Sequence, residues 1–143
     1  MKRVLVIVII VIAFVAVAYF LFLRRTPYSI AANIAGFKIS SSLIVEQFND
    51  DWANNPGGDG ESFVLFSLKK DEKEKLINDC KINNYTPLPI KDILPDGFIY
   101  NYIGKKNQSG FYKLSIDKKD KRNYQITVLD LQQKKLLVYN IIY

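Results

Sequence analysis

The pattern of apolar and polar residues separates an uninterrupted apolar segment at the N-terminus from a longer, mixed region. Twenty residues, from Val4 to Leu23, contain no charge, no proline and no glycine, and two basic residues flank them on each side. A helix of this length rises about 30 Å, which matches the hydrocarbon core of a bilayer. The pattern therefore predicts a transmembrane helix, with residues 1–25 as a single-pass anchor.

Two other interpretations compete with the anchor. A helix buried in a soluble domain normally carries a polar stripe, whereas Tyr19 is the only polar side chain of this segment. A cleaved signal peptide is the stronger alternative, because Ala16-Val17-Ala18 has the small-x-small form of a cleavage site. Cleavage after Ala18 would leave a strongly apolar new N-terminus, so we favour the uncleaved anchor.

The basic residues beside the segment bear on orientation and on net charge. The positive charges on the two sides of the segment nearly balance, so they do not set the orientation. A very short N-terminal tail usually stays in the cytoplasm, which favours a cytoplasmic N-terminus with residues 26–143 on the outer side of the cell membrane. The chain has 20 basic and 14 acidic residues, and without the four flanking ones 16 basic residues remain. The densest basic run, residues 117–122, is mixed with acids as in an exposed loop. We therefore expect no nucleic-acid partner.

The mixed region is expected to be a juxtamembrane linker, residues 26–35, followed by a single α+β domain, residues 36–143. The linker can already include a first short strand. The last apolar run of the chain is apolar on both faces, so it is a central strand or a contact with another chain, and a central strand is favoured. Five β-rich runs separated by turn formers predict a mainly antiparallel sheet, at residues 43–48, 61–68, 110–116, 124–131 and 136–142.

One helix is expected to cover this sheet. Asp71 is placed to cap its start, and Glu74 three residues later completes a capping box. Apolar side chains that follow, among them Leu76 and Cys80, lie on one side of the helix and would face the sheet. Prolines after the helix keep residues 85–97 in an irregular path.

The residue types that many catalytic and zinc sites need are missing. The chain has no histidine and one cysteine, Cys80. This excludes a Ser-His-Asp triad, an intrachain disulfide and a zinc site rich in His or Cys. No glycine-rich phosphate loop precedes a helix. We therefore expect a protein that is not an enzyme and needs no cofactor, with Cys80 as a packing residue.

The glycine-rich loop before the second strand run carries candidate ligand chemistry. Asp50, Asp51, Asp59 and Glu61 could supply oxygen atoms to calcium, while the glycines allow close backbone approach. Asp59 and Glu61 could instead be the carboxylate pair of a hydrolase. The third interpretation is favoured: Asp59 braces a tight turn through bonds to backbone amides. Separately, loop aromatics are candidates for an interface with a protein partner, namely Trp52, Tyr85, Tyr100 and Tyr102.

The order of short motifs over residues 40–143 resembles a group of small uncharacterised bacterial proteins. Those proteins carry a His-Gly-Gly-Phe-His-Gly-Asp-Gly segment, a Trp-x-x-Leu-Pro segment and an Ile-Asp-Arg-His segment. This chain lacks the histidines, and Tyr85 stands where tryptophan is usual, so no chemistry of those side chains transfers to it. The matching stretches are Gly57-Gly58-Asp59-Gly60-Glu61, Tyr85-Thr86-Pro87-Leu88-Pro89, Gly110-Phe111-Tyr112 with Ile116-Asp117, and Ile126-Thr127-Val128-Leu129-Asp130 with Leu136-Leu137-Val138-Tyr139.

Two functions are compatible with these features. The first is a membrane-anchored, non-catalytic binding domain of a bacterial envelope protein, which engages a protein partner and in one version acts as an immunity protein against a toxin. The second is a module that binds calcium or another ligand, or hydrolyses an envelope component, through residues 50–61. The anchor and the missing catalytic groups favour the first function.

Overall fold

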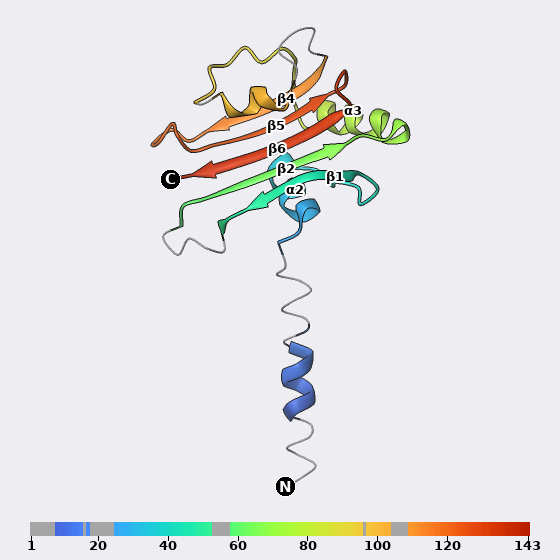
Figure 1. Cartoon of the computed structure of the whole chain (residues 1–143), viewed down its shortest axis with the longest axis vertical. Coiled ribbons are helices and arrows are strands. Elements are labelled where there is room, and N and C mark those ends of the chain that lie inside the picture. The colour runs from blue at the N-terminus through green and yellow to red at the C-terminus, as the bar shows by residue number, and fades with distance from the viewer. Residues whose placement is uncertain (1–7, 16, 18–24, 53–57, 96, 104–108) are drawn as a thin grey trace.

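The domain is an α+β structure built on one antiparallel sheet. The computed structural model describes residues 8–15, 17, 25–52, 58–95, 97–103 and 109–143. Six strands lie in the order β1-β2-β6-β5-β4-β3, and Figure 1 shows them side by side with α2 behind the sheet. The strands are β1 (Ile44–Asp50), β2 (Gly60–Ser67), β3 (Thr86–Pro87), β4 (Gly110–Ile116), β5 (Tyr124–Asp130) and β6 (Lys135–Ile142). The helices are α2 (Pro27–Ala35) and α3 (Lys73–Ile82), with the 3-10 turns η2 (Lys70–Glu72) and η3 (Phe98–Asn101).

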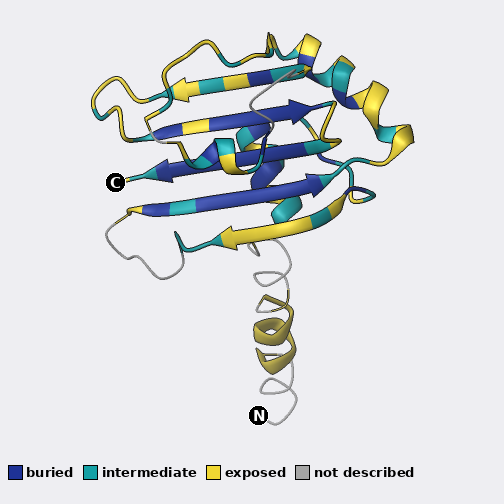
Figure 2. Ribbon diagram, turned by 45° about the horizontal axis from the view of Figure 1, so that its top comes forward, coloured by how far each residue is buried: buried dark blue, intermediate teal, exposed yellow. Residues whose placement is uncertain are grey.

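The strand predictions are confirmed to within a residue or two. β6 lies between β2 and β5, so its continuous apolar run is that of a central strand. Figure 2 shows these three strands buried along most of their length, whereas β1 at the edge is largely exposed. Hence β1 does not bury a full face, although its sequence contains enough apolar residues to do so.

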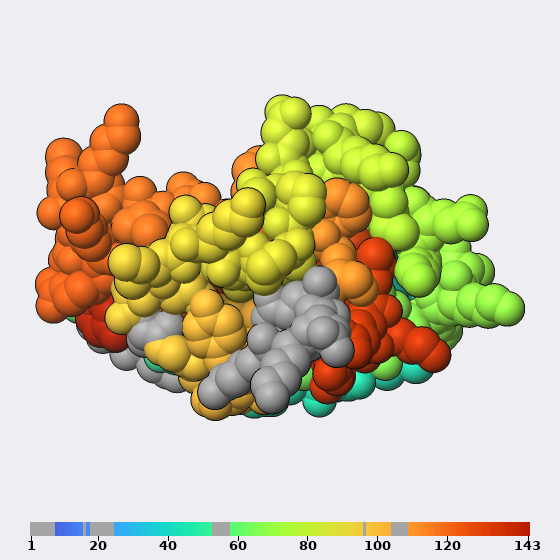
Figure 3. Space-filling view, turned by 90° about the horizontal axis from the view of Figure 1, so that it is seen from above, coloured from blue at the N-terminus to red at the C-terminus, as the bar shows by residue number. Residues whose placement is uncertain are grey.

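Apolar layers on both faces of the sheet explain the burial of the central strands. On one face, side chains such as Val64 and Val138 pack with α2 and α3. On the other face, Phe63 and Leu137 pack with apolar residues of the segment 88–103. Figure 3 shows the first part of this segment, in yellow, between the β4–β5 hairpin and α3. The segment 88–103 is therefore a structural layer, which we call the second layer, and not only a connection.

The expected linker, residues 26–35, is a helix of the domain. The hydroxyl of Thr26 accepts a hydrogen bond from the backbone of Ser29, and the Ser29 hydroxyl accepts one from the backbone of Thr26. This capping box starts α2, and Gly36 ends it at φ 77°, a conformation that glycine adopts without strain. The segment predicted as a juxtamembrane linker thus packs on the sheet as a helix, and two helices cover the sheet instead of one. The buried residues of α2 are Ile30, Ala31 and Ala35.

The helix expected after Asp71 is α3, but it starts differently from the prediction. Asp71 lies in η2, and α3 begins after Glu72 with no side-chain cap. The Glu72 carboxylate instead accepts a hydrogen bond from the hydroxyl of Ser42, which ties this turn to the segment before β1. Leu76 and Cys80 are buried against the sheet as predicted. The predicted capping box of Asp71 and Glu74 does not form, because Asp71 lies in the preceding turn η2 and not at the start of α3.

Part of the predicted membrane anchor lies within the described residues. Residues 8–15 are helical and exposed, with exposed fractions of their large apolar residues between 47% and 75%. Across the described ranges, no helix combines the length and hydropathy that crossing a membrane requires. Val4 and Leu23, the predicted ends of the span, lie outside the described residues, as does Ala18 at the alternative cleavage site.

Cys80 occupies the core between α3 and the sheet, where it is fully buried. Burial disfavours the thiolate and, with a smaller effect of the Asp79 charge, raises the pKa of Cys80 to about 12. At about pH 9 an ordinary thiol is largely ionised, so we predict that a disulfide reagent such as DTNB modifies Cys80 about 100-fold more slowly in the folded chain than in urea. Equal rates in the two states would contradict the burial of this thiol.

Candidate functional site

A row of polar side chains crosses one end of the sheet. The strand register pairs Asp50 with Ser62, Ser62 with Asn140, Asn140 with Gln125, and Gln125 with Ser115. Residues directly paired across antiparallel strands point to the same face. These five side chains, which we call the polar row, therefore lie on one face, and they come from β1, β2, β6, β5 and β4.

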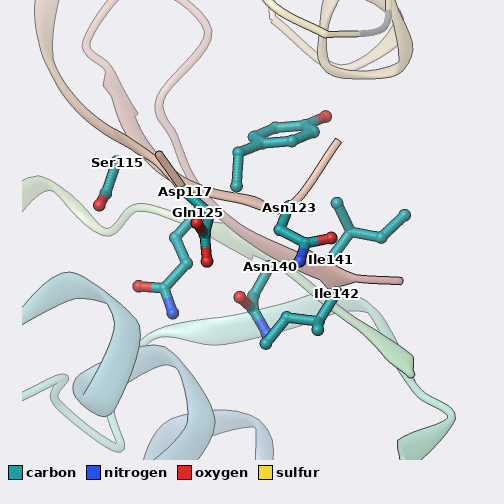
Figure 4. A pocket seen from close by; sticks show the side chains of 8 residues that line it. Ser115, Asp117, Asn123, Gln125, Asn140, Ile141 and Ile142 are labelled. Carbon is teal, nitrogen blue, oxygen red and sulfur yellow. The ribbon is translucent and has the colours of Figure 1, made fainter. Parts of the chain in front are cut away.

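Two hollows lie along the polar row, and Asn140 lines both. The first is about 180 Å³, beside α2, and the second is about 240 Å³, over the ends of β4, β5 and β6. Figure 4 shows Ser115, Gln125 and Asn140 on one side of the strands in the second hollow. Each hollow is smaller than a typical small-molecule site of roughly 300–1,000 Å³. Because they share Asn140, we call the two hollows together the groove. The first is lined by Arg25, Ile30, Asn33, Ile34, Trp52, Ser62 and Asn140, and the second also by Asp117, Asn123, Tyr124, Ile141 and Ile142.

Arg25 lines the first hollow, the one beside α2. Its Nε donates to Asp50 Oδ2 at 2.7 Å, its Nη2 donates to Asp50 Oδ1 at 2.9 Å, and Nη2 also donates to Ser62 Oγ at 3.2 Å. The Asp50 side chain is only 7% exposed, so this two-point pair neutralises a carboxylate that would otherwise be buried alone. The hydrogen bonds to Asp50 raise the pKa of Arg25, which stays charged.

Trp52 lies beside Arg25, on the backbone of β2. A Cβ at Gly60 would come within 2.6 Å of the indole ring, so only glycine allows the ring to lie where it does. The Arg25 guanidinium lies 5.6 Å from the ring centroid, within the range of a cation–π contact. The glycine-rich loop was predicted to allow a close approach to its backbone. At Gly60 the indole ring of Trp52 makes this approach.

Two buried polar atoms of the groove lining have no hydrogen-bond partner. They are the indole Nε1 of Trp52 and the side-chain Oδ1 of Asn140, a residue that is 7% exposed. Buried polar groups are normally paired, and each unpaired one costs about 1–3 kcal/mol. One atom is a donor and the other an acceptor, so a bound molecule with hydroxyl groups can pair with both once the side chains that cover these atoms move. These atoms make the groove the candidate functional site.

The acidic residues proposed as metal ligands have separate surroundings and do not share one site. Asp50 is paired with Arg25, and the Asp51 carboxylate accepts a hydrogen bond from the backbone of Glu61 at 2.5 Å. Glu61 accepts a bond from the Tyr139 hydroxyl at 3.4 Å, and Asp59 is exposed. Nowhere in the described ranges do three or more His, Cys, Asp or Glu side chains form a group that could hold a metal ion. Asp51 therefore braces the described part of this loop.

The aromatic residues proposed for an interface have different surroundings. Tyr85 is 6% exposed and donates to the Ala35 carbonyl at 2.8 Å, so it belongs to the core and not to an exposed aromatic surface. Tyr100 and Tyr102 belong to the second layer and are half-buried there. The ring centroid of Tyr102 lies 4.7 Å from that of Phe63. Of the four proposed residues, Trp52 is the one that lines the groove.

The sequence contained a signal for the polar row that did not enter the prediction. Asn140 interrupts a strongly apolar run, and Ser62 and Gln125 lie at the start of two others. A single polar residue in one strand normally faces solvent or is satisfied locally. Only the strand register shows that these three residues lie next to one another.

No family model matches this chain, and comparisons with curated proteins and with solved structures found no match either. The resemblance to small bacterial proteins therefore stays a prediction. The groove and the N-terminal segment are therefore the features of the chain that bear on its function.

Proposed function

We propose that this chain is a non-catalytic binding domain, which its N-terminal segment holds at the cell membrane. The observation that carries the binding role is the groove, where the buried Nε1 donor of Trp52 and the buried Oδ1 acceptor of Asn140 lack partners. The chain has no histidine, and its cysteine is buried in the core away from the groove. The lining residues thus offer hydrogen bonds more readily than acid–base or nucleophilic chemistry. A protein partner, in an immunity-like role or another, remains a prediction from the sequence.

The exposed apolar helix supports the role of the N-terminal segment. Every residue of the described stretch 8–15 is apolar and exposed, and an apolar surface of this kind is unfavourable in water. A bilayer would cover it, and the full apolar run of twenty residues is long enough to span one. Arg25 lies two residues after the end of this run and is held by Asp50, so the groove would lie close to the membrane surface.

Membrane fractionation tests the tether. We expect the full chain to stay in the membrane pellet after an alkaline carbonate wash. The double variant Ile10→Lys with Ile12→Lys is expected to move largely to the supernatant, because each lysine near the centre of a span costs roughly 2.5–3.5 kcal/mol. The control is Ile93→Lys, which places the same charge at a side chain of the domain that is 91% exposed. Release of the unmodified chain by carbonate, or equal behaviour of all variants, would contradict the tether.

Protease protection tests the proposed orientation. If residues 26–143 lie outside, protease added to intact spheroplasts will digest the domain, whereas a cytoplasmic domain will be degraded only after lysis. The intact mass of the membrane-bound chain then distinguishes the uncleaved anchor from a product cleaved after Ala18.

A further inference from the structure

The chemistry of the groove lining narrows the class of ligand. Most of its polar side chains are neutral amides and hydroxyls, and each of these can both donate and accept a hydrogen bond. A ligand that matches them must offer donors and acceptors in alternation along its length, as the hydroxyl groups of a sugar do. The Ser62 hydroxyl already donates to Asp50 Oδ1 and accepts from Arg25 Nη2, and Asn123 Oδ1 already accepts from the backbone of Tyr143. The neutral members are Asn33, Ser62, Ser115, Asn123, Tyr124, Gln125 and Asn140.

The charged groups of the groove are one compensated ion pair and one separate carboxylate. Arg25 and Asp50 neutralise each other through two hydrogen bonds. At the other end, the Asp117 carboxylate accepts hydrogen bonds from the backbone of Lys119 at 2.6 Å and of Asp120 at 3.4 Å, within its own turn. Asp117 is exposed and no ion pair of the described residues involves it, so this end carries a single negative charge that disfavours an anion. One carboxylate does not make a metal site, so the groove favours a neutral ligand.

The shape of the groove favours a ligand with several units. Neighbouring strands are about 4.8 Å apart, so the polar row from β1 to β4 is roughly 19 Å long. The row ends at Asp50 and Ser115, and Trp52, two residues after Asp50, lines the hollow beside α2 with a flat aromatic side chain whose N–H is unpaired. Indole rings combine an apolar surface with one donor, which suits the mixed apolar and hydroxylated faces of a sugar ring.

From these observations we propose that the groove binds a neutral oligosaccharide, with Asn140 at its centre and Trp52 at one end. Hydroxyl groups of the sugar donate to Asn140 Oδ1 and accept from Trp52 Nε1, which gives both buried atoms the partners they lack. Gln125 and Ser115 extend the contact along the row. The proposal rests on the binding role proposed above and names its ligand.

Binding can be followed through Trp52 because it is the only tryptophan of the chain. The full chain is placed in nanodiscs or in a detergent without a sugar headgroup. It is then titrated with neutral trisaccharides of glucose, galactose, mannose and N-acetylglucosamine. We expect at least one of them to change the tryptophan fluorescence and to give a saturable calorimetric isotherm. A trimer of galacturonic acid, a Gly-Ser pentapeptide and calcium chloride are the alternative probes.

Three variants locate the site. Asn140→Leu, Gln125→Leu and Trp52→Phe are each expected to weaken saccharide binding by about tenfold or more, measured by calorimetry. The control Asn101→Leu changes an exposed asparagine of η3, outside the lining of the groove, and should leave the affinity unchanged. Gln125 is exposed, so its variant keeps the test valid if Asn140→Leu folds poorly.

The melting temperature separates a binding role of Asn140 from a structural one. Because the Asn140 acceptor is unpaired in the free domain, Asn140→Leu should leave the melting temperature unchanged or raise it while it weakens binding. Failure of all neutral saccharides to bind overturns the proposal, as does binding that the three variants do not weaken. If the pentapeptide binds instead and the variants abolish that binding, the saccharide is wrong but the binding domain stands. Absence of binding by every probe, in a chain that still fractionates with membranes, also counts against the binding role and leaves the tether intact.

Discussion

Replacing Phe63 with alanine is expected to lower the free energy of unfolding by about 3–5 kcal/mol, a large part of the stability of a domain this size. Phe63 is 1% exposed and fixes the second layer to the sheet. Its ring centroid lies 5.4 Å from that of Phe98, 4.7 Å from that of Tyr102 and 6.4 Å from that of Tyr139. Alanine would remove these contacts and leave a cavity that the sheet backbone cannot close.

Urea unfolding of the full chain in a mild detergent measures this loss, and Phe48→Ala is its matched control. Phe48 lies on the edge strand β1 and is 41% exposed, so its loss should cost less than about 1 kcal/mol. Increased protease cleavage within residues 88–103 should accompany the Phe63 variant, because the layer loses its main contact. Similar costs at the two positions would show that the second layer contributes little to stability.

Gly110→Ala is the second substitution with a large expected effect, a loss of at least about 3 kcal/mol. Gly110 starts β4 at φ 137°, a conformation that side-chain-bearing residues rarely adopt at a cost of about 1–3 kcal/mol. A Cβ there would also lie 1.9 Å from the carbonyl oxygen of Leu129, so β4 would have to move away from β5 at a similar cost. The Gly110 carbonyl accepts a hydrogen bond from the backbone of Leu88, and this displacement would also disturb the start of the second layer.

The control for this substitution is Gly97→Ala. Gly97 has φ −91° and no atom within 4 Å of the added Cβ, so alanine should be neutral or stabilise the chain by up to about 1 kcal/mol. Thermal unfolding of the two variants, followed by circular dichroism, compares them directly. A Gly110→Ala melting temperature equal to that of Gly97→Ala would contradict the close contact between β4 and Leu129.

Local sequence patterns predicted the strands well, because alternation and turn formers act over a few residues. β6 was recognisable as a central strand, since both of its faces are apolar. Helix starts were predicted less well. Thr26 and Ser29 form a capping box with serine in the place where glutamate or glutamine is usual, whereas the more conventional pair at Asp71 and Glu74 forms none. Capping depends on the dihedral angles of the chain entering the helix, which a short motif does not specify.

The sequence by itself determined that this chain has an apolar N-terminal segment, an antiparallel sheet with a central last strand, and no histidine for a catalytic or metal site. These properties depend on residue type and on short-range order. The tertiary structure alone decided that residues 88–103 cover the second face of the sheet, and that Asp50 pairs with Arg25 in place of being available to a metal ion. It also decided that Ser62, Gln125 and Asn140 lie side by side. Such neighbours are distant in the sequence, and they meet only through strand register and packing, for which no local pattern carries information.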